Sequence, residues 1–570
     1  MWYVISACRY LSLHASNTNL RSCFLCADDV LGYIGPSLQD YKGCDVIDIH
    51  PGACLWSQKL HDYLQPRRHL LMEPEDKYKP FIDPLLATPG STYRHTTKSG
   101  AHPKSYFQSY EEIFDDALLP SRDPLPRGDA RLRQPNKTLL VTGTLSRRYR
   151  SVRGHLNNVH SANMLLNHMV HGSQTNTLFH AYGLVRMLFW HPEDTKSAVM
   201  PDMIVQRGGF GAALETAADM VEIAGCDRAK AQADRNSSIN KLSRYRSPEI
   251  DQLGCDRTLR RMESTGVHMP AHRRPLLHQS AITRRDTTEL AEAMAEERRR
   301  VPITMPEGKT LEDAVTAHEE KLAELYKLVA AGKRTLLNVP YLFKFPEASK
   351  RNFTPVDQSR LGPYMDLWGA QIALEAAVAI QESKGAHDEA STLAARLREA
   401  TAKLRAAFLL KNMAAAQTRD MMRILIHEIH AFSGGVVAHD RRPFESLAVE
   451  ADEFWPQFGQ FLLDIQPRPG NLADDLVSPS EANATLRELV GTMWQLAASP
   501  MTMALDRIGS NASTDLIPAA PNVTDASKGG RLDPEDLCVR LATRDTIQQL
   551  TTAYLEWPFK PSSVELSSIT

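Results

Sequence analysis

The chain has 570 residues, 42% of them hydrophobic and 24% charged, which is typical of a globular protein with two or three hydrophobic cores. The formal net charge of −2 excludes an overall basic nucleic-acid binder, and no apolar run is long enough to predict a membrane span. Eight cysteines are too sparse for a disulfide framework and indicate a reducing compartment.

The first 27 residues contain Arg9 and Arg21, several serines and no acidic residue before Asp28. This composition is typical of an organellar transit peptide, and the alternative is an ordinary N-terminus. Cys23 and Cys26 form a CxxC pair without a second pair at zinc spacing, so we predict no metal site.

The first strand and helix are predicted between Asp45 and Leu60, which read DVIDIHPGACLWSQKL. Alternating apolar residues run into a Pro-Gly turn, after which leucines recur at helical intervals, so the pattern predicts a strand, a tight turn and a helix. An α/β protein holds a cofactor at such a turn. A dinucleotide fingerprint would need several glycines, however, and only Gly52 is present.

Further strand-like segments follow as far as Gly225, separated by stretches of helical length. They begin with the apolar run RHLLMEP and continue at Lys137–Ser146, Val185–Trp190 and Asp219–Gly225. Strands that alternate with helices favour a parallel, doubly wound sheet, and we place this α/β core at residues 28–225.

The charge of the chain is unevenly spread. Between Ser121 and His160 nine Lys and Arg residues stand against Asp123 and Asp129, a local excess of +7. Such a segment attracts phosphates or forms an ordinary solvated face, and the residues alone leave both open.

A long insertion is predicted over residues 226–440. Its first part, to about Arg300, is polar and Arg-rich, which favours a partly disordered surface segment. An amphipathic helix follows, with Thr310 and Asp313 placed as a capping pair and with an inward stripe at Leu311, Val315, His318, Leu322, Leu325 and Val329. We expect His318 to be a core or rim residue. The segment IHEIH (His427, Glu428, His430) lacks the histidine spacing of a zinc protease helix, so we interpret it as structural.

The last part of the chain returns to the sheet and then becomes helical. Residues 441–475 contain a predicted strand, Gly459–Pro467, and residues 476–570 are expected to form a helical C-terminal domain with a tail. In the tail, Pro558 cannot continue a helix. We expect Trp557 and Phe559 to be anchors, either on the chain's own helical domain or on a polymerase or an unpaired base.

Two carboxylates are candidates for binding an adenosine-like cofactor. Glu73 follows the second strand, where an acid typically accepts from both ribose hydroxyls. Asp116 is the candidate acceptor for an adenine amine, with Asp115 as the alternative.

Seven segments, in this order, resemble the rRNA adenine dimethyltransferase family, and more closely its fungal mitochondrial branch, the mitochondrial transcription factor B type. They are DVIDIHPGACLWSQKL, RHLLMEP, DDALL, LLVTGTLS, MLFWHPEDTKSAVMPD, DEFWPQFGQFLLDIQP and LEWPFKP. The resemblance covers about residues 28–225 and 440–570. It implies a Rossmann-like class I methyltransferase sheet with a large, mainly helical insertion and a helical C-terminal domain.

The resemblance also implies roles for single residues. His50 stands where the family has the first glycine of its cofactor turn, Glu73 where it has the ribose-binding acid and Asp116 where it has the adenine-binding acid. Together with Gly52 they imply an S-adenosylmethionine pocket that is weak or vestigial.

The catalytic motif departs from the family. Active members have Asn-Leu-Pro-Tyr or a close variant after the fourth strand, where this chain has Thr144, Leu145, Ser146 and Arg147. A threonine hydroxyl cannot copy the donor and acceptor geometry with which an Asn amide holds the amine of a flipped adenine. We therefore expect no catalytic residues at Thr144 and Ser146.

The function that these features predict is that of a mitochondrial transcription initiation factor, located in the matrix, which acts with mitochondrial RNA polymerase on promoter DNA. The basic residues Arg147, Arg148, Arg150 and Arg153 are the expected phosphate contacts. Two alternatives stay open: an S-adenosylmethionine-dependent rRNA adenine dimethyltransferase that binds rRNA, and a helical interaction scaffold that works through its insertion.

Overall fold

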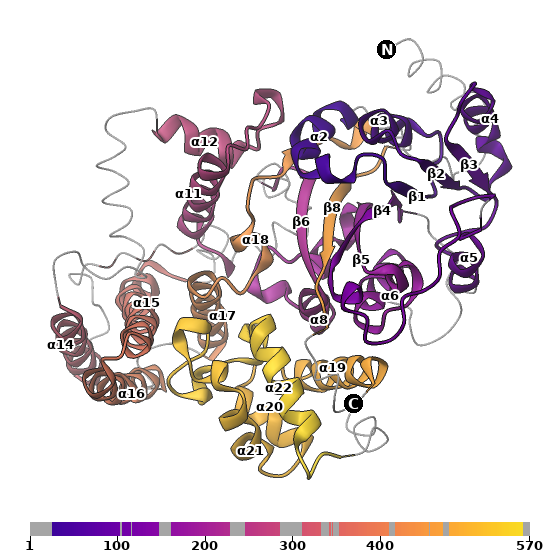
Figure 1. Ribbon diagram of the computed structural model, residues 1–570. Coiled ribbons are helices and arrows are strands. Elements are labelled where there is room, and N and C mark those ends of the chain that lie inside the picture. The colour runs from indigo at the N-terminus through magenta and orange to yellow at the C-terminus, as the bar shows by residue number, and fades with distance from the viewer. Residues whose placement is uncertain are drawn as a thin grey trace.

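The protein is an α/β protein with two additional helical parts (Figure 1). The structure is a computed structural model, and it describes residues 26–102, 105–115, 117–146, 161–228, 245–285, 310–331, 341, 343, 345, 353–409, 416–454, 457–470 and 478–561. The α/β fold class predicted from the sequence is confirmed.

The described strands form one eight-stranded sheet in the order β3-β2-β1-β4-β5-β8-β6-β7. All its pairings are parallel except those of β8, which runs antiparallel to both β5 and β6. The strands are β1 (Asp45–Ile49), β2 (Arg68–Met72), β3 (Tyr93–Thr96), β4 (Pro135–Thr144), β5 (Leu184–Pro192), β6 (Ala218–Gly225), β7 (Leu447–Ala448) and β8 (Gln460–Pro467).

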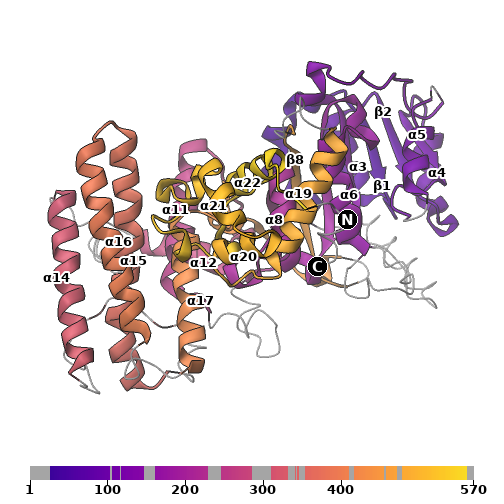
Figure 2. The ribbon, with the colours of Figure 1, turned by 90° about the horizontal axis from the view of Figure 1, so that it is seen from below.

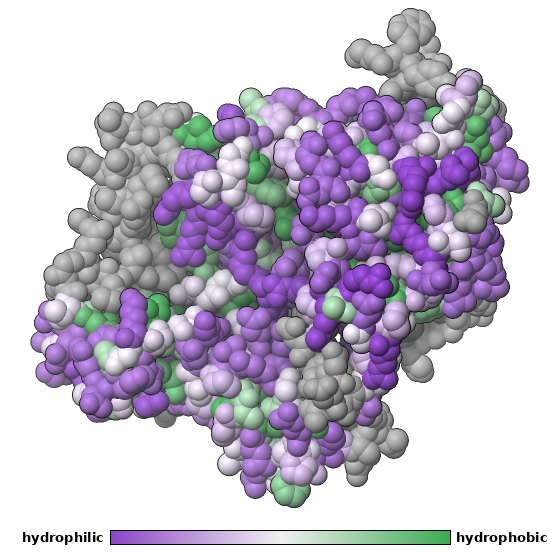
Figure 3. All heavy atoms as spheres, viewed as in Figure 1, coloured by the Kyte–Doolittle hydropathy of each residue, from purple (hydrophilic) through white to green (hydrophobic). Residues whose placement is uncertain are grey.

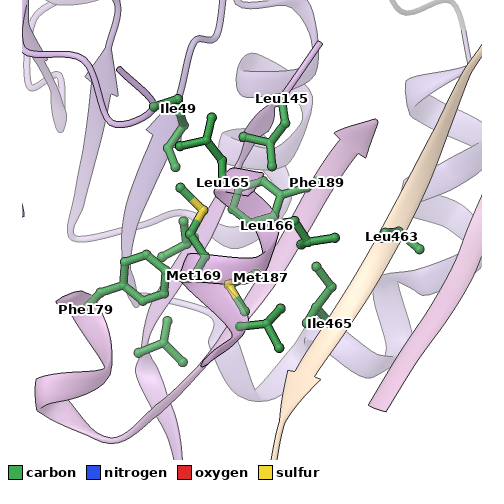
Figure 4. Packing of buried hydrophobic residues seen from close by; sticks show 14 of the residues in the cluster. Ile49, Leu145, Leu165, Leu166, Met169, Phe179, Met187, Phe189, Leu463 and Ile465 are labelled. Atoms are coloured by element: carbon green, nitrogen blue, oxygen red, sulfur yellow. The ribbon is translucent and has the colours of Figure 1, made fainter. Parts of the chain in front are cut away.

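The central strands β1 and β5 are buried along their whole length, as strands covered on both faces are. On β5, Met187 and Phe189 join one hydrophobic cluster while Leu188 and Trp190 join the cluster on the opposite face. Figure 4 shows the first cluster, in which Leu165, Leu166 and Met169 of one helix lie over side chains from β5 and β8. Each face of the sheet therefore has its own helical cover.

The helices of the α/β part cover these two faces. One cluster contains residues from α5, α6 and α8, and the opposite cluster contains residues from α2 and α3. The helices are α2 (Ala27–Ile34), α3 (Leu55–Leu64), α4 (Lys79–Ala87), α5 (Tyr106–Glu112), α6 (Ser161–Thr175), α7 (Lys196–Val199) and α8 (Gly209–Ala217).

The segment directly after β6 differs from its prediction. For the described residues 245–285 the expectation of a surface insertion is wrong, because α11 (Pro248–Thr265) and α12 (Leu276–Arg285) belong to the α/β part. Cys255, Leu259 and Met262 of α11 are buried in the same cluster as Val46 and Leu140 of the sheet. The many polar residues of α11 conceal this, because its apolar side chains are few and are divided between this cluster and that of Ile250 and Leu253.

The remaining insertion helices form a bundle. They are α14 (Leu311–Ala330), α15 (Pro355–Ser383), α16 (His387–Leu409) and α17 (Ala416–Ser433), followed by the short α18 (Ala438–Arg441). The predicted capping pair is confirmed, since Thr310 and Asp313 form a reciprocal capping box at the start of α14. His318 is buried and its Nε2 lies 2.8 Å from Gln371 Oε1 of α15, as expected of a core residue.

The C-terminal part of the described chain is helical, as its sequence predicts. Its helices are α19 (Pro479–Trp494), α20 (Met501–Ile508), α21 (Ala512–Ala519) and α22 (Arg544–Glu556), packed around a separate hydrophobic cluster. Seen from below, these helices lie between the sheet and the bundle of α14, α15 and α16 (Figure 2).

Candidate functional site

The candidate site lies at the carboxyl edge of the parallel strands, where ligands bind in open α/β sheets. Ile49 of β1 pairs with Met72 of β2 and with Gly143 of β4, so the three strands end side by side. This register places His50 and Glu73, which follow β1 and β2, beside Thr144, the last residue of β4.

The turn after β1 holds two non-glycine residues in the left-handed region. His50 has φ 53° and Cys54 has φ 59°, and Gly52 between them has φ 60°. The left-handed region costs a non-glycine residue on the order of 1 kcal/mol, so the surrounding contacts must hold the turn. One is the pair of His50 Nε2 and Ser99 Oγ, 3.0 Å apart, and another is the 3.1 Å bond from the His50 amide to the Met72 carbonyl.

Glu73, the predicted ribose acid, is 1% exposed and is engaged by the chain itself. Its Oε2 accepts from the amide of Gly52 (3.2 Å) and its Oε1 from the amide of Glu75 (3.1 Å). A buried carboxylate needs such donors, because an unsatisfied one is costly. Each carboxylate oxygen can accept a second bond, so a ribose at Glu73 would have to share these oxygens with the two amides.

Residues 99–101 pack directly on the strand ends. A Cβ at Gly100 would lie 2.8 Å from Tyr110 Oη and 3.2 Å from both Ile49 Cγ1 and Met72 Sδ. Tyr110 also donates to the Gly100 carbonyl over 2.9 Å. The end of β1 and the end of β2 are therefore covered by the loop that follows β3.

The thiol next to this turn is not reactive. Burial raises the pKa of Cys54, and the nearby carboxylates of Asp48 and Glu73 raise it further. A thiol that stays protonated is a poor nucleophile. Covalent catalysis through Cys54 is therefore not a chemistry that this site supplies.

The segment from Gly143 to Ser146, where the resemblance places a catalytic motif, is tied into the fold. Gly143 has φ 142° and a Cβ there would lie 2.1 Å from the Ile49 carbonyl oxygen, so only glycine fits. Thr144 is buried, and the amide of Leu145 donates to the Trp190 carbonyl over 2.9 Å. The Ser146 hydroxyl donates to Gln460 Oε1 of β8 over 2.9 Å. The Leu145 amide and the Ser146 hydroxyl therefore bond within the sheet.

A charged cluster at the same edge was not predicted from the sequence. Lys196 Nζ lies 2.6 Å from Glu222 Oε1 and 3.5 Å from Glu193 Oε1. Burial alone would lower the pKa of Lys196, but the two carboxylates raise it above its usual range. The ammonium therefore links the end of β5 to β6. The acidic and basic residues in HPEDTK are the only local signal of this cluster.

Five predicted site residues lie outside the described residues: Asp116, Arg147, Arg148, Arg150 and Arg153. Asp115, the alternative to Asp116, lies within the described residues. Its carboxylate caps the turn that follows it in the chain. Its Oδ1 accepts from the amides of Ala117 (2.9 Å) and Leu118 (3.2 Å). This role does not bring it to the site.

The two aromatic residues predicted as anchors near the C-terminus differ in their exposure. Trp557 is 6% exposed within the C-terminal cluster, and its Nε1 donates to Asp515 Oδ2 over 2.9 Å. Of the two alternatives for Trp557, this burial supports an anchor on the chain's own helical domain rather than on a partner or a base. Phe559, by contrast, is 74% exposed. The predicted helix end is confirmed, since α22 stops at Glu556.

The segment IHEIH is structural, as interpreted from its spacing. Glu428 accepts from Arg246 over 2.6 Å and from the Ile204 amide over 2.9 Å. Among the described residues, no group of three or more His, Cys, Asp or Glu side chains is placed to hold a metal ion.

No protein-family model matches the chain, and no curated protein is similar enough to count as a relative. In the described parts of the chain, no helix combines the length and the apolar character that crossing a membrane requires.

Proposed function

We propose that the chain is a mitochondrial transcription initiation factor that acts with mitochondrial RNA polymerase in binding and opening promoter DNA. The observation that carries the proposal is the covered carboxyl edge of the sheet. Glu73 is engaged by the amides of Gly52 and Glu75, and Ser146 is bonded to Gln460, so the edge favours a fold kept for binding over a working methyltransferase site.

The strand order supports the methyltransferase-like part of the proposal. An antiparallel strand between the fifth and sixth parallel strands is what we expect of a class I methyltransferase sheet, and β8 lies between β5 and β6 in this way. A sheet derived from an rRNA-modifying enzyme would already have surfaces suited to nucleic acid. Phosphate contacts from the basic segment around Arg147 would then position a strand without reading its sequence.

Phe559 supports a role in holding melted DNA. Its ring is exposed at the end of the described chain, next to Trp557 at a centroid distance of 6.3 Å. Stacking of an unpaired base on an exposed aromatic ring is worth roughly 1 to 3 kcal/mol and is independent of sequence. The buried Trp557 would serve as the fixed support for Phe559.

The test is run-off transcription with the cognate mitochondrial RNA polymerase on a duplex promoter and on the same promoter melted in advance. The chain should raise the product at least tenfold on the duplex and have little effect on the melted template. Equal product with and without the chain on both templates would refute the proposal.

Two variants extend this experiment. Phe559→Ala should reduce transcription from the duplex template, while Met503→Ala, which removes another exposed apolar side chain of the same domain, should not.

Incubation with labelled S-adenosylmethionine and small-subunit rRNA tests the enzyme alternative. Methyl transfer to the rRNA would favour the dimethyltransferase over the initiation factor.

A further inference from the structure

A pocket lies at the opposite edge of the sheet from His50 and Glu73. Its volume is about 350 Å³, within the roughly 300 to 1,000 Å³ of small-molecule sites. It opens where β8 ends and β5 begins; Figure 4 shows these two strands running in opposite directions. It is lined by Tyr41, Arg133, Pro135, Leu184, Arg186, Asp219, Gln466, Pro467, Arg468 and Pro469.

Arg186 forms the fixed wall of this pocket. Its guanidinium donates to Asp464 through Nε (2.8 Å) and Nη2 (2.6 Å) and to the Ser37 carbonyl through Nη1 (2.7 Å). It also lies over the ring of Tyr41, 5.6 Å from the ring centroid. Because Asp464 offsets its charge and every bond is internal, Arg186 shapes the pocket rather than supplying its net charge.

Arg468 supplies a donor that the pocket can use. Its Nε donates to Asp219 Oδ2 over 2.8 Å, and no other side-chain bond of Arg468 is found within the described parts of the chain. Asp219 also accepts from Arg544 over 2.5 Å. Burial alone would raise the pKa of Asp219, but the bonds from Arg468 and Arg544 lower it, so the carboxylate stays ionised. Two guanidinium groups thus share one carboxylate.

Arg133 also lines the pocket and adds a further positive charge. It lies at the end of a 3₁₀ turn, Ala130–Arg133, and its Nη2 donates to the Gly470 carbonyl over 2.8 Å. Around the pocket four guanidinium groups (Arg133, Arg186, Arg468, Arg544) accompany Asp219, Asp464 and the exposed Asp545, which lies 3.6 Å from Arg544. The balance of these named charges is positive.

The backbone around these groups is stiff. Pro135, Pro467 and Pro469 line the pocket, and a proline ring locks φ. Hydrophilic residues cover most of the described surface in the view of Figure 3. What distinguishes this pocket is that arginine side chains converge on a concave site with a rigid rim.

We propose that this pocket binds a terminal phosphate group, carried by a mononucleotide or by the end of a nucleic-acid strand. The planar fork of an arginine matches phosphate oxygens in pairs, and a phosphate can accept from several arginines at once. Arg468 and Arg133 make the contacts, and Arg186 holds the wall between them. The inference does not depend on the proposed role in transcription.

Calorimetric titration of the full chain with inorganic pyrophosphate and with AMP tests the proposal. Both should bind saturably, and Arg133→Gln with Arg468→Gln should weaken binding at least tenfold. The matched control is Arg127→Gln with Arg131→Gln, which removes the same charge from exposed positions of the same segment, outside the pocket. The control should bind like the unmodified chain.

Three further results decide the outcome. Absence of saturable binding of both probes at millimolar concentration, or equal weakening in the control, would overturn the proposal. If the double variant does not fold, as judged by its unfolding midpoint, the single change of the exposed Arg133 to Gln must still weaken binding. Competition of AMP with a 5′-phosphorylated oligonucleotide, but not with its 5′-hydroxyl form, would identify a strand end as the source; without competition the source is the free nucleotide.

Discussion

Trp557 and Phe559 stand two residues apart in the chain but have opposite environments. The indole of Trp557 fills a space beside Gly509, where an added Cβ would lie 2.6 Å from Trp557 Cη2, and it is held by Asp515. Phe559 follows Pro558 and leaves the domain surface. A pair that looks uniform in sequence is therefore divided into a core residue and an exposed one.

This division predicts different effects of truncation. Trp557→Ala should reduce the free energy of unfolding by about 3 to 5 kcal/mol, because it leaves a cavity and an unpaired Asp515. Phe559→Ala should change it by less than about 0.5 kcal/mol. Chemical unfolding followed by circular dichroism measures both, and similar losses for the two variants would contradict the assignment.

At the scale of elements, the insertion and the C-terminal domain are joined by a buried ion pair. Glu375 of α15 accepts from Arg531 Nε (2.8 Å) and Nη2 (2.9 Å), and both side chains are almost fully buried. Gln371 Nε2 donates to the same carboxylate over 2.8 Å and so connects it to His318 of α14. A polar network thus runs from the outer helix of the bundle to the C-terminal domain.

Breaking this pair should uncouple the two parts. Glu375→Ala leaves the Arg531 guanidinium buried without its carboxylate, which should cost about 3 to 5 kcal/mol of stability. Glu399→Ala on α16 removes an exposed carboxylate paired with Lys403 and should leave the unfolding midpoint unchanged. Limited proteolysis between α15 and α17 should be faster only in Glu375→Ala. Equal proteolysis of the two variants would mean that the pair does not couple the parts.

At the scale of the whole molecule, buried histidines determine the response to acid. Burial lowers the pKa of His171 and His180 to about 4 and of His427 and His430 to about 3. The unfolded chain therefore binds more protons than the folded one below the ordinary pKa of 6.5. Their contribution to stability is complete above pH 6.5 and is lost as the pH falls toward the folded values.

Two buried acids act in the opposite direction. Burial raises the pKa of Glu428 to about 7 and of Asp536 to about 6, so their contribution is present at low pH and is lost as the pH rises through these values. Each pKa unit corresponds to about 1.4 kcal/mol, and the four histidines outweigh the two acids. The net stability should therefore fall from pH 6.5 to pH 4.

Unfolding by urea between pH 7 and pH 4.5 checks this prediction. His180 bonds to the Met169 carbonyl and accepts from the Val185 amide, and His180→Gln should flatten the dependence on pH. His387→Gln, an exposed histidine at the start of α16, should leave the dependence unchanged. A chain that gains stability on acidification would contradict the assignment of these histidines.

Part of this protein could be predicted from the sequence because the responsible contacts are local. The strand, turn and helix from Asp45 to Leu60 follow from apolar periodicity and a Pro-Gly turn, and the start of α14 follows from a capping pair three residues apart. The end of α22 before Pro558 follows from the missing proline N–H. Glu73 and His50 could be placed together because parallel strands end at one edge.

The remainder was decided only by tertiary structure, because it depends on pairs of residues far apart in the chain. Ser146 meets Gln460 across 314 positions, and this contact exists only because β8 enters the sheet antiparallel between β5 and β6. The polar α11 joins the α/β core because Cys255, Leu259 and Met262 are buried in the cluster that also contains Val46 and Leu140. Burial of Trp557 likewise needs Asp515 and the space beside Gly509. Local propensity carries no information about such partners, since their free energy of burial arises only when the chain is folded.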